Sequence, residues 1–298
     1  MLRRMYRTAS IAVIFALAIP RVVAADEQPS SIETHGWTDG SIAIGAGLAA
    51  LAFTRIPVNS ERLWQHEAFG NLDRSARDNF SAKAAALSDL LLVTSLAAPM
   101  FTEIGGIDDD SDSHFLVYGE SLAISLALNA GTKYLVQRPR PYAYHRDRRV
   151  AAWAREQGKD SRLSFYSGHA ALAFTGATTG GYLFATNSDN TSARTAMWAS
   201  GAVLASATAI MRVRAGKHYY SDVLTGAVLG VAVGYAVPRL HDDGGITLSG
   251  REWLGIGSGV AVGALAALVL PLPADMAMSL RPLVVENGGG VAFGGAIK

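Results

Sequence analysis

Residues 164–185 have the sequence SFYSGHAALAFTGATTGGYLFA, a short polar segment that leads directly into an apolar one. The apolar part is rich in alanine, leucine and glycine, contains no proline and is too long for a fully buried strand, so it predicts a helix. Apolar segments of the same kind recur at residues 41–53, 84–101, 115–136, 196–211, 223–237 and 254–270. The sequence therefore predicts an all-α fold, a bundle of helices.

The pattern of small and apolar residues along the helices indicates whether lipid or water surrounds the bundle. Glycines repeat every fourth residue in two segments, at 226, 230 and 234 and again at 255, 259 and 263. This spacing lets helices approach closely, especially in membranes, although close packing in a soluble bundle explains it almost as well. Segments 170–185, 196–212 and 223–237 show little polar face, as expected when lipid surrounds them. We therefore expect a membrane-embedded bundle, with a soluble one as the alternative.

The two ends of the chain differ from its middle. Arginines at 3, 4 and 7 precede the apolar run 11–19, and small residues follow at 22–25. Residues 1–25 are predicted to be a signal peptide or an uncleaved anchor, and both place the chain in the cell envelope, outside the cytoplasm. Residues 26–270 form one helical domain. In the tail, 271–298, Asn287-Gly288 between two short apolar runs predicts a β-hairpin.

Composition limits the kinds of partner. The formal net charge is +1, so no overall basic field attracts nucleic acid, and any anion site must be local. The chain has 0 cysteines, which excludes disulfides, thiolate chemistry and cysteine-bound metals.

The first segment with residues suited to anion binding or catalysis is KYLVQRPRP, residues 133–141. Here a long apolar helix ends in chain that prolines restrict to extended conformations. Lysine offers a compact charge, and arginine a planar fork that binds two oxygens at once. Lys133 and Arg140 therefore suit a tetrahedral dianion. Basic residues at helix ends also serve as dipole partners or membrane-interface charges, so this segment alone decides nothing.

The second segment is the polar start of the opening stretch. Ser167 and Gly168 at a helix start present free N–H groups to an anion, and the imidazole of His169 can give a proton near neutral pH. A serine N-cap followed by an incidental histidine accounts for the same residues.

The third segment is RVRAGKHYYSD, residues 212–222, in which His218 and Asp222 are four residues apart. A carboxylate that holds one ring nitrogen leaves the other free to attack, so this pair suits a histidine nucleophile. A surface contact between the two side chains is the simpler alternative.

In order and spacing, the three segments together resemble the motifs of the type 2 phosphatidic acid phosphatase (PAP2) and vanadium haloperoxidase superfamily. The resemblance covers a motif core of about residues 115–237. Its matching residues are Lys133, Arg140-Pro141, Ser167-Gly168-His169, Arg212, His218 and Asp222. The chain departs from the pattern at Tyr166, where the family usually has proline, and at Met211, where it usually has serine. These departures put the level of activity, more than the type of reaction, in doubt.

The resemblance implies a helical phosphatase domain without metal or cofactor. His218 would attack phosphorus to give a phosphohistidine, which water hydrolyses, and His169 would protonate the leaving oxygen. Asp222 would orient His218. The transferred oxygens would be stabilised by Lys133, Arg140, Ser167, Gly168 and Arg212. Arg138 and Arg214 compete for the roles of Arg140 and Arg212, but the spacing favours the latter two.

Four functions follow as hypotheses. The first is a phosphatase of lipid phosphates such as phosphatidic acid, an isoprenyl pyrophosphate or lipid A. The alternatives are a soluble periplasmic acid phosphatase, a vanadate-dependent haloperoxidase, and an inactive protein that binds lipid headgroups. By the resemblance, a bacterial membrane enzyme would present its site to the periplasm. That orientation requires segment 41–53, which is short for a span, to be interfacial or re-entrant.

Overall fold

The computed structural model describes residues 32–59, 70–104, 111–272, 278–285 and 288–295. The predicted signal peptide lies outside these residues. Each predicted apolar segment is helical, which confirms the all-α prediction. The long helices are α1 (Gly36–Phe53), α3 (Ala82–Ile104), α4 (Ser111–Val136), α6 (Gly168–Thr186), α7 (Thr191–Arg214), α8 (Tyr220–Leu240) and α9 (Gly250–Val269). The short elements are α2 (Asn71–Ser75), η1 (Ala76–Asp78), η2 (Pro141–Tyr144), α5 (Arg148–Glu156) and η3 (Gly158–Arg162).

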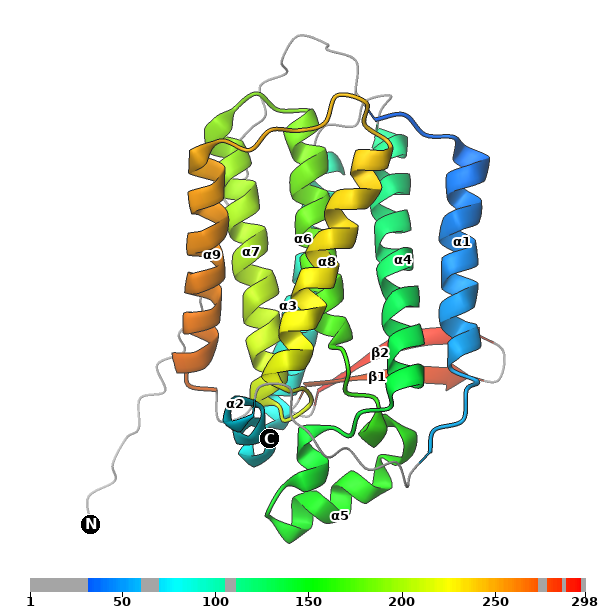
Figure 1. The fold of residues 1–298 in the computed structure, drawn as a ribbon, viewed down its shortest axis with the longest axis vertical. Helices are drawn as coiled ribbons and strands as arrows, with labels where there is room; N and C mark the ends of the chain where they lie inside the picture. Colours follow the sequence, from blue (N-terminus) through cyan, green and yellow to red (C-terminus); the bar gives the residue numbers. More distant parts are fainter. Residues whose placement is uncertain (1–31, 60–69, 105–110, 273–277, 286–287, 296–298) are drawn as a thin grey trace, which may run out of the picture.

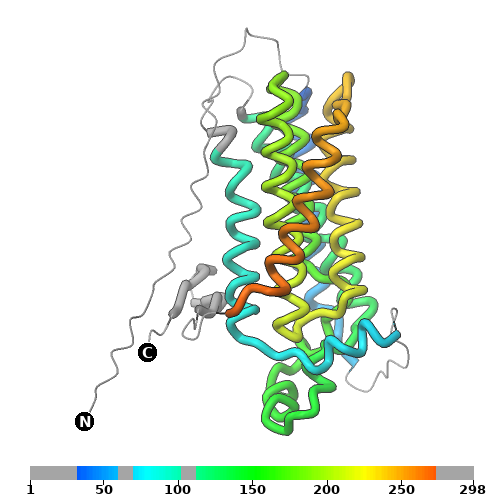
Figure 2. Tube along the Cα trace, turned by 90° about the vertical axis from the view of Figure 1, so that its left-hand side faces the viewer, coloured from blue at the N-terminus to red at the C-terminus, as the bar shows by residue number. Residues whose placement is uncertain are grey.

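The long helices stand side by side and alternate in direction along the chain (Figure 1). Helices α2 and α5 lie across one end of the bundle, together with the starts of α3, α6 and α8; we call this the α5 end. The start of α1, the end of α8 and the start of α9 lie at the opposite end, here the far end. The view turned by 90° shows α3 on one side of the bundle and α8 and α9 on the other (Figure 2).

Helix α6 is the centre of the bundle and packs against α3, α4, α7 and α8. Almost all of its side chains are buried. Helix α8 approaches it through the predicted glycines: a Cβ added at Gly226 would lie 2.6 Å from the carbonyl oxygen of Ser167. The small-residue spacing therefore does bring helices close together, and it sets the start of α6 directly against α8.

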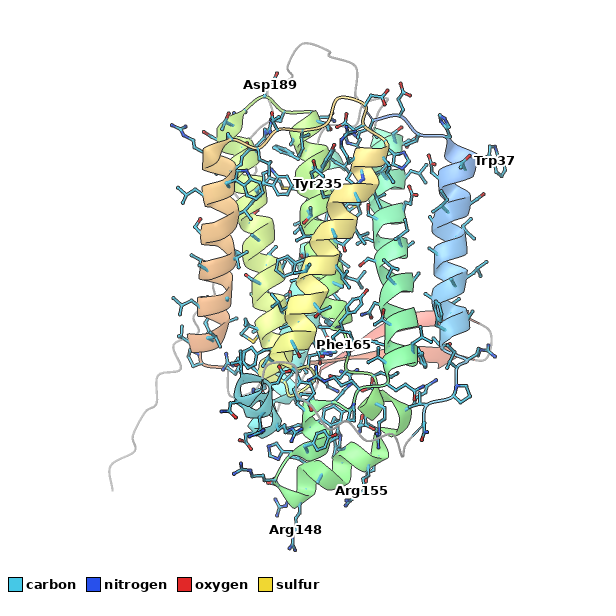
Figure 3. The ribbon with its side chains drawn as sticks, in the orientation of Figure 1. Trp37, Arg148, Arg155, Phe165, Asp189 and Tyr235 are labelled. Atoms are coloured by element: carbon cyan, nitrogen blue, oxygen red, sulfur yellow. The ribbon has the colours of Figure 1, made fainter. Side chains whose placement is uncertain are left out.

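Four of the described helices are long and apolar enough to cross a membrane, namely α3, α7, α8 and α9. Large apolar side chains on these helices are exposed, and Trp253 at the start of α9 is 61% exposed. Trp37 at the start of α1 is 93% exposed and points away from the bundle at the same end (Figure 3). Tryptophans in such positions are typical of membrane interfaces. These features support membrane association. Helices α1, α4 and α6 are not among the four, and α1 stands upright beside α4 (Figure 1).

The predicted terminal hairpin is not supported as part of the fold. The backbones of β1 (Met278–Val285) and β2 (Gly288–Gly295) pair antiparallel, but β2 is mostly glycine. Glycine weakens a strand, and an isolated two-stranded hairpin is at best marginally stable in water. The hairpin therefore stays a prediction.

Candidate active site

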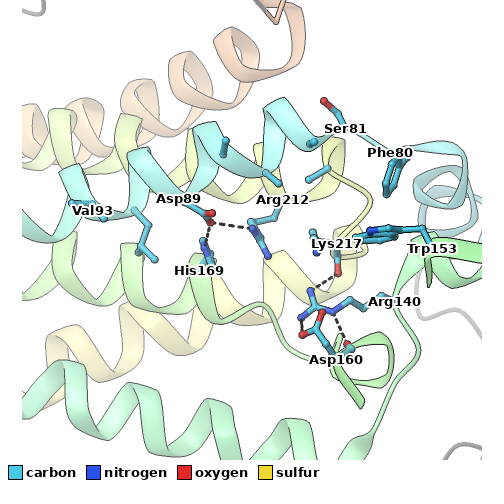
Figure 4. A pocket seen from close by; sticks show the side chains of 15 residues that line it. Phe80, Ser81, Asp89, Val93, Arg140, Trp153, Asp160, His169, Arg212 and Lys217 are labelled. Carbon is cyan, nitrogen blue, oxygen red and sulfur yellow. Dashed lines mark hydrogen bonds and ion pairs between the residues drawn. The ribbon is translucent and has the colours of Figure 1, made fainter. Parts of the chain in front are cut away.

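A pocket of about 590 Å³ opens at the α5 end (Figure 4). One wall is the first half of α3, and the others come from the segment around η2 and α5, the start of α6, and the end of α7 with the loop after it. Its charged and titratable lining residues are Asp89, Arg140, Asp160, His169, Arg212 and Lys217. Three of these, Arg140, His169 and Arg212, were predicted as site residues from separate segments of the sequence.

Arg140 is held in place on every side of its guanidinium group. The chain before η2 is extended at Arg140, and its N–H donates to the carbonyl of Ser161 at 2.8 Å. The side chain donates to the Asp160 carboxylate at 2.7 Å and to the carbonyl of Lys217 at 3.1 Å. Its Nη1 lies 3.4 Å from Nε2 of His218. Arg140 therefore links the first motif to the third.

His218 lies in the loop between α7 and α8 and is 1% exposed. Its Nδ1 is 2.8 Å from the carbonyl oxygen of Ser164. Because a carbonyl only accepts hydrogen bonds, Nδ1 carries the proton, and the lone pair on Nε2 faces Arg140. Burial, and then the charges of Arg140 and Arg212, hold the pKa of His218 well below its ordinary value. The ring is therefore neutral near pH 7, as a nucleophile must be.

The expected hydrogen bond between Asp222 and His218 is not made. Oδ2 of Asp222 is 3.7 Å from Nδ1 of His218, and the carbonyl of Ser164 takes that position instead. Helix α8 begins between the two residues, so Asp222 turns back to accept from the N–H of Tyr219 at 3.0 Å. Asp222 also accepts from the hydroxyl of Ser164 at 2.5 Å. It therefore reaches His218 through Ser164.

Arg138 and Arg214 lie away from the pocket. Arg138 pairs with Asp222 at 2.7 Å and with Asp73 of α2 at 2.9 Å, and all three side chains are almost completely buried. Arg214 donates to the carbonyls of Ala267 and Leu270 near the end of α9. Arg140 and Arg212, which the spacing favoured, line the pocket, and Arg138 and Arg214 do not.

His169 and Arg212 meet at a carboxylate that the motifs do not contain. Nε2 of His169 donates to Oδ1 of Asp89 at 2.7 Å, and Nη1 of Arg212 donates to the same oxygen at 3.3 Å (Figure 4). Asp89 lies on α3, before the motif core. A lone carboxylate inside an apolar segment was the available signal for it, since such a charge needs a partner.

Lys133, Ser167 and Gly168 form the edge of the site where α4 ends and α6 begins. Ser167 caps α6 by accepting from the N–H of Ala170 at 3.3 Å, and Gly168 is the first residue of the helix. The Lys133 Nζ lies 3.5 Å from the place that a Cβ on Gly168 would take. That separation is an ordinary contact, whereas the same Cβ would lie only 2.6 Å from Oδ1 of Asn129, so a larger residue at 168 would displace Asn129. The three residues are together, although they are not part of the pocket lining.

Two further charged residues of the pocket were missed in the sequence. Burial opposes the charge of Asp160, but Arg140 and Lys217 outweigh it and lower the pKa of this carboxyl. Burial and then Arg140 lower the pKa of Lys217 to about 8. Its ammonium lies 5.2 Å from the ring centres of both Tyr142 and Trp153, which is within cation–π range. Neither residue belongs to a spacing pattern that sequence reasoning could use.

Met211 and Tyr166, the two departures from the family pattern, are both buried inside the bundle. Met211 is 1% exposed and belongs to an apolar cluster with Ala84, Ala215 and Ala267. Tyr166 is also buried, and its carbonyl accepts from the side-chain amide of Asn129 at 2.8 Å. Neither side chain lines the pocket.

Arginine and lysine groups and His169 thus line a hollow at the α5 end, and the neutral His218, which does not line it, lies 3.4 Å from Arg140. This arrangement can bind a phosphoryl group and transfer it. Residues 114–245 match the model of the PAP2 superfamily. No curated protein and no solved structure matches the chain. The matched residues contain the three motifs, so the family whose model matches is the one that the motifs resemble, the PAP2 superfamily, whose chemistry is that of phosphatases and haloperoxidases.

Proposed function

We propose that this protein is a metal-independent phosphatase of lipid phosphomonoesters or pyrophosphates that works through a phosphohistidine on His218. The observation that carries the proposal is the state of His218: neutral, with Nδ1 fixed by the Ser164 carbonyl and Nε2 3.4 Å from an arginine of the pocket wall. A nucleophilic lone pair beside a phosphate-binding cation is what in-line attack on phosphorus requires.

The proposed reaction has two steps. Nε2 of His218 forms a bond to phosphorus while the bond to the ester oxygen breaks. Burial and Arg212 lower the pKa of His169, so the step requires Asp89 and the bound phosphate to hold this ring in its cationic form, from which it gives that oxygen a proton. Water then attacks the phosphohistidine with His169 as base, which releases phosphate and restores both rings. Arg140, Arg212, Lys133 and the N–H of Gly168 stabilise the charge on the transferred oxygens, with the Ser167 hydroxyl beside them.

The apolar side of the pocket supports a lipid substrate over a soluble one. Phe80, Leu92 and Val93 line it together with alanines of α3. Since α3 is also one of the candidate spans, a phosphate bound at Arg212 has an apolar wall beside it that continues along the membrane. A lipid headgroup could enter here while its chains stay in the bilayer. This observation places the lipid phosphatase ahead of the soluble acid phosphatase.

The proposed location of the protein is the bacterial cell envelope, with the α5 end of the bundle facing the periplasm. The exposed arginines of α5, such as Arg148 and Arg155, favour the opposite orientation under the positive-inside rule. Labelling of single cysteines placed at each end of the bundle separates the two orientations.

The test is a phosphate-release assay in detergent on phosphatidic acid, an isoprenyl pyrophosphate and p-nitrophenyl phosphate, with and without EDTA. We expect EDTA-insensitive release that vanadate inhibits and that His218→Ala lowers by at least about 1000-fold. His35→Ala, an exposed histidine at the far end, is the matched control and should keep full activity. Wild-type rates in His218→Ala would exclude the proposed nucleophile. Halide oxidation with vanadate and peroxide, without phosphate release, would identify a haloperoxidase instead.

A further inference from the structure

A second group of chemically active side chains lies at the far end of the bundle. Asp39 of α1 is 5% exposed and Glu120 of α4 is 4% exposed, and both lie beside His241, which follows α8. Each of the three offers a ligand atom, and these atoms all lie within 4.8 Å of one another. The group joins three segments that are distant in the sequence.

The charges of this group do not balance. Buried carboxylates need positive charge close by. Among the described residues, the ion-pair partner of both is His241, with Nε2 2.9 Å from Glu120 Oε2 and Nδ1 4.0 Å from Asp39 Oδ2. An imidazole supplies at most one positive charge against two negative ones. A divalent cation would neutralise both carboxylates.

The orientation of the His241 ring points independently to a metal. Its Nδ1 lies 3.0 Å from the carbonyl oxygen of Glu33, which can only accept, so Nδ1 carries a proton and Nε2 is directed toward Glu120. Histidines that bind metals are commonly fixed in this way, with the second nitrogen donating to a backbone carbonyl. The backbone N–H of His35 likewise orients the carboxylate of Asp39 at 2.7 Å.

We propose that Asp39, Glu120 and His241 form a binding site for a divalent transition-metal ion, for which zinc is the probe. Ligand distances near 2.1 Å in a tetrahedral site place ligand atoms about 3.4 Å apart. The separations found here, from 2.9 Å up to the 4.8 Å limit, require only small side-chain shifts. The bound ion would fasten the start of α1 to α4 and to the end of α8.

This site is separate from the proposed phosphatase chemistry. Helix α8 has 21 residues and therefore holds His218 and His241 about 30 Å apart. A metal at the far end would stabilise the bundle without entering the reaction, so EDTA should lower the thermal midpoint and leave phosphate release at lower temperature unchanged. Failure of either proposal can thus be distinguished from failure of the other.

The experiment uses the full chain in detergent, stripped with EDTA and titrated with Zn²⁺. We expect one zinc per chain, a raised thermal midpoint, and an X-ray absorption spectrum of nitrogen and oxygen ligands that includes imidazole. Glu120→Gln keeps the shape of the side chain and should weaken binding by at least about 100-fold. Asp39→Asn serves as the second variant. His145→Ala, just after η2 at the α5 end, controls for histidines outside the site and should bind as the wild type does.

Two results would overturn the proposal. One is a wild-type chain that takes up no stoichiometric zinc. The other is zinc bound equally well by Glu120→Gln and Asp39→Asn, which would place the ion elsewhere. Either would leave the three residues as an ion-paired contact between helices.

Discussion

The pocket at the α5 end and the cluster of Asp39, Glu120 and His241 at the far end have opposite imbalances of charge. At the α5 end, the pocket lining has Arg140, Arg212 and Lys217 against two carboxylates. At the far end, Asp39 and Glu120 share the one ring of His241. Between the two ends, the helices are largely apolar. The sign of the excess charge at each end thus indicates the sign of the ligand that it suits: an anion in the pocket and a cation opposite.

The supporting structure satisfies its buried charges with ion pairs and hydrogen bonds together. Behind the pocket, Arg138 pairs with both Asp73 and Asp222, and the hydroxyls of Ser221 and Ser164 donate to these two carboxylates. Arg194 is likewise matched by Glu252 at 2.7 Å. Buried charges with complete partners fix geometry, whereas an excess charge provides binding.

The largest expected difference between the two ends is their side of the membrane. Because the natural chain has 0 cysteines, Arg155→Cys at the α5 end and Asp189→Cys at the far end each create a single labelling site (Figure 3). In cells with a permeabilised outer membrane, we expect an impermeant maleimide to label Arg155→Cys fully and Asp189→Cys only after lysis. The reverse pattern would turn the pocket to the cytoplasm, and equal labelling would contradict a membrane-spanning bundle.

The next effect concerns the carboxylate that joins His169 to Arg212. The carboxylate of Asp89 orients His169 and favours the cationic form of its ring. Asp89→Asn removes both effects, so we expect kcat to fall about 100-fold for an alkyl phosphate. An ester with a good leaving group, such as p-nitrophenyl phosphate, needs little proton donation and should lose much less. Asp89→Glu should restore part of the rate. Equal losses for both substrates would show that Asp89 serves Arg212 alone.

The smallest effect is on the pH dependence. Since burial, Arg140 and Arg212 hold the pKa of His218 below the ordinary 6.5, kcat/KM should stay level as the pH falls through 6.5 and decline only below it. Arg140→Gln should raise the pH of this decline by about one unit.

The unfolded chain takes up a proton on His218 near pH 6.5 and the folded chain does not. The contribution of neutral His218 to the stability of the folded chain is therefore fully present above pH 6.5 and is lost as the pH falls below it. Parallel kinetic and thermal profiles, with Arg214→Gln as control, test both statements.

The sequence predicted what depends on local pattern. The long apolar segments gave the helices, and the motif residues gather because they lie where helices end or begin at one end of the bundle. Asp89 and Asp160 could not be found in this way, since their contacts depend on how α3 packs against α6 and α7 and on where η3 turns. Asp222 lies 3.7 Å from Nδ1 of His218 without a hydrogen bond, because α8 begins between the two residues and the carbonyl of Ser164 takes the position at Nδ1. Asp39, Glu120 and His241 meet only through the tertiary fold.

The close contact of Gly226 with the carbonyl of Ser167 has a consequence for the accuracy of the site. Main chain touches main chain there, with no side chain between that could change rotamer. The helix that carries one histidine and the helix that follows the other are therefore spaced by rigid peptide groups. The spacing of the two histidine rings is therefore set by the backbone. It should stay the same when side chains elsewhere in the bundle repack.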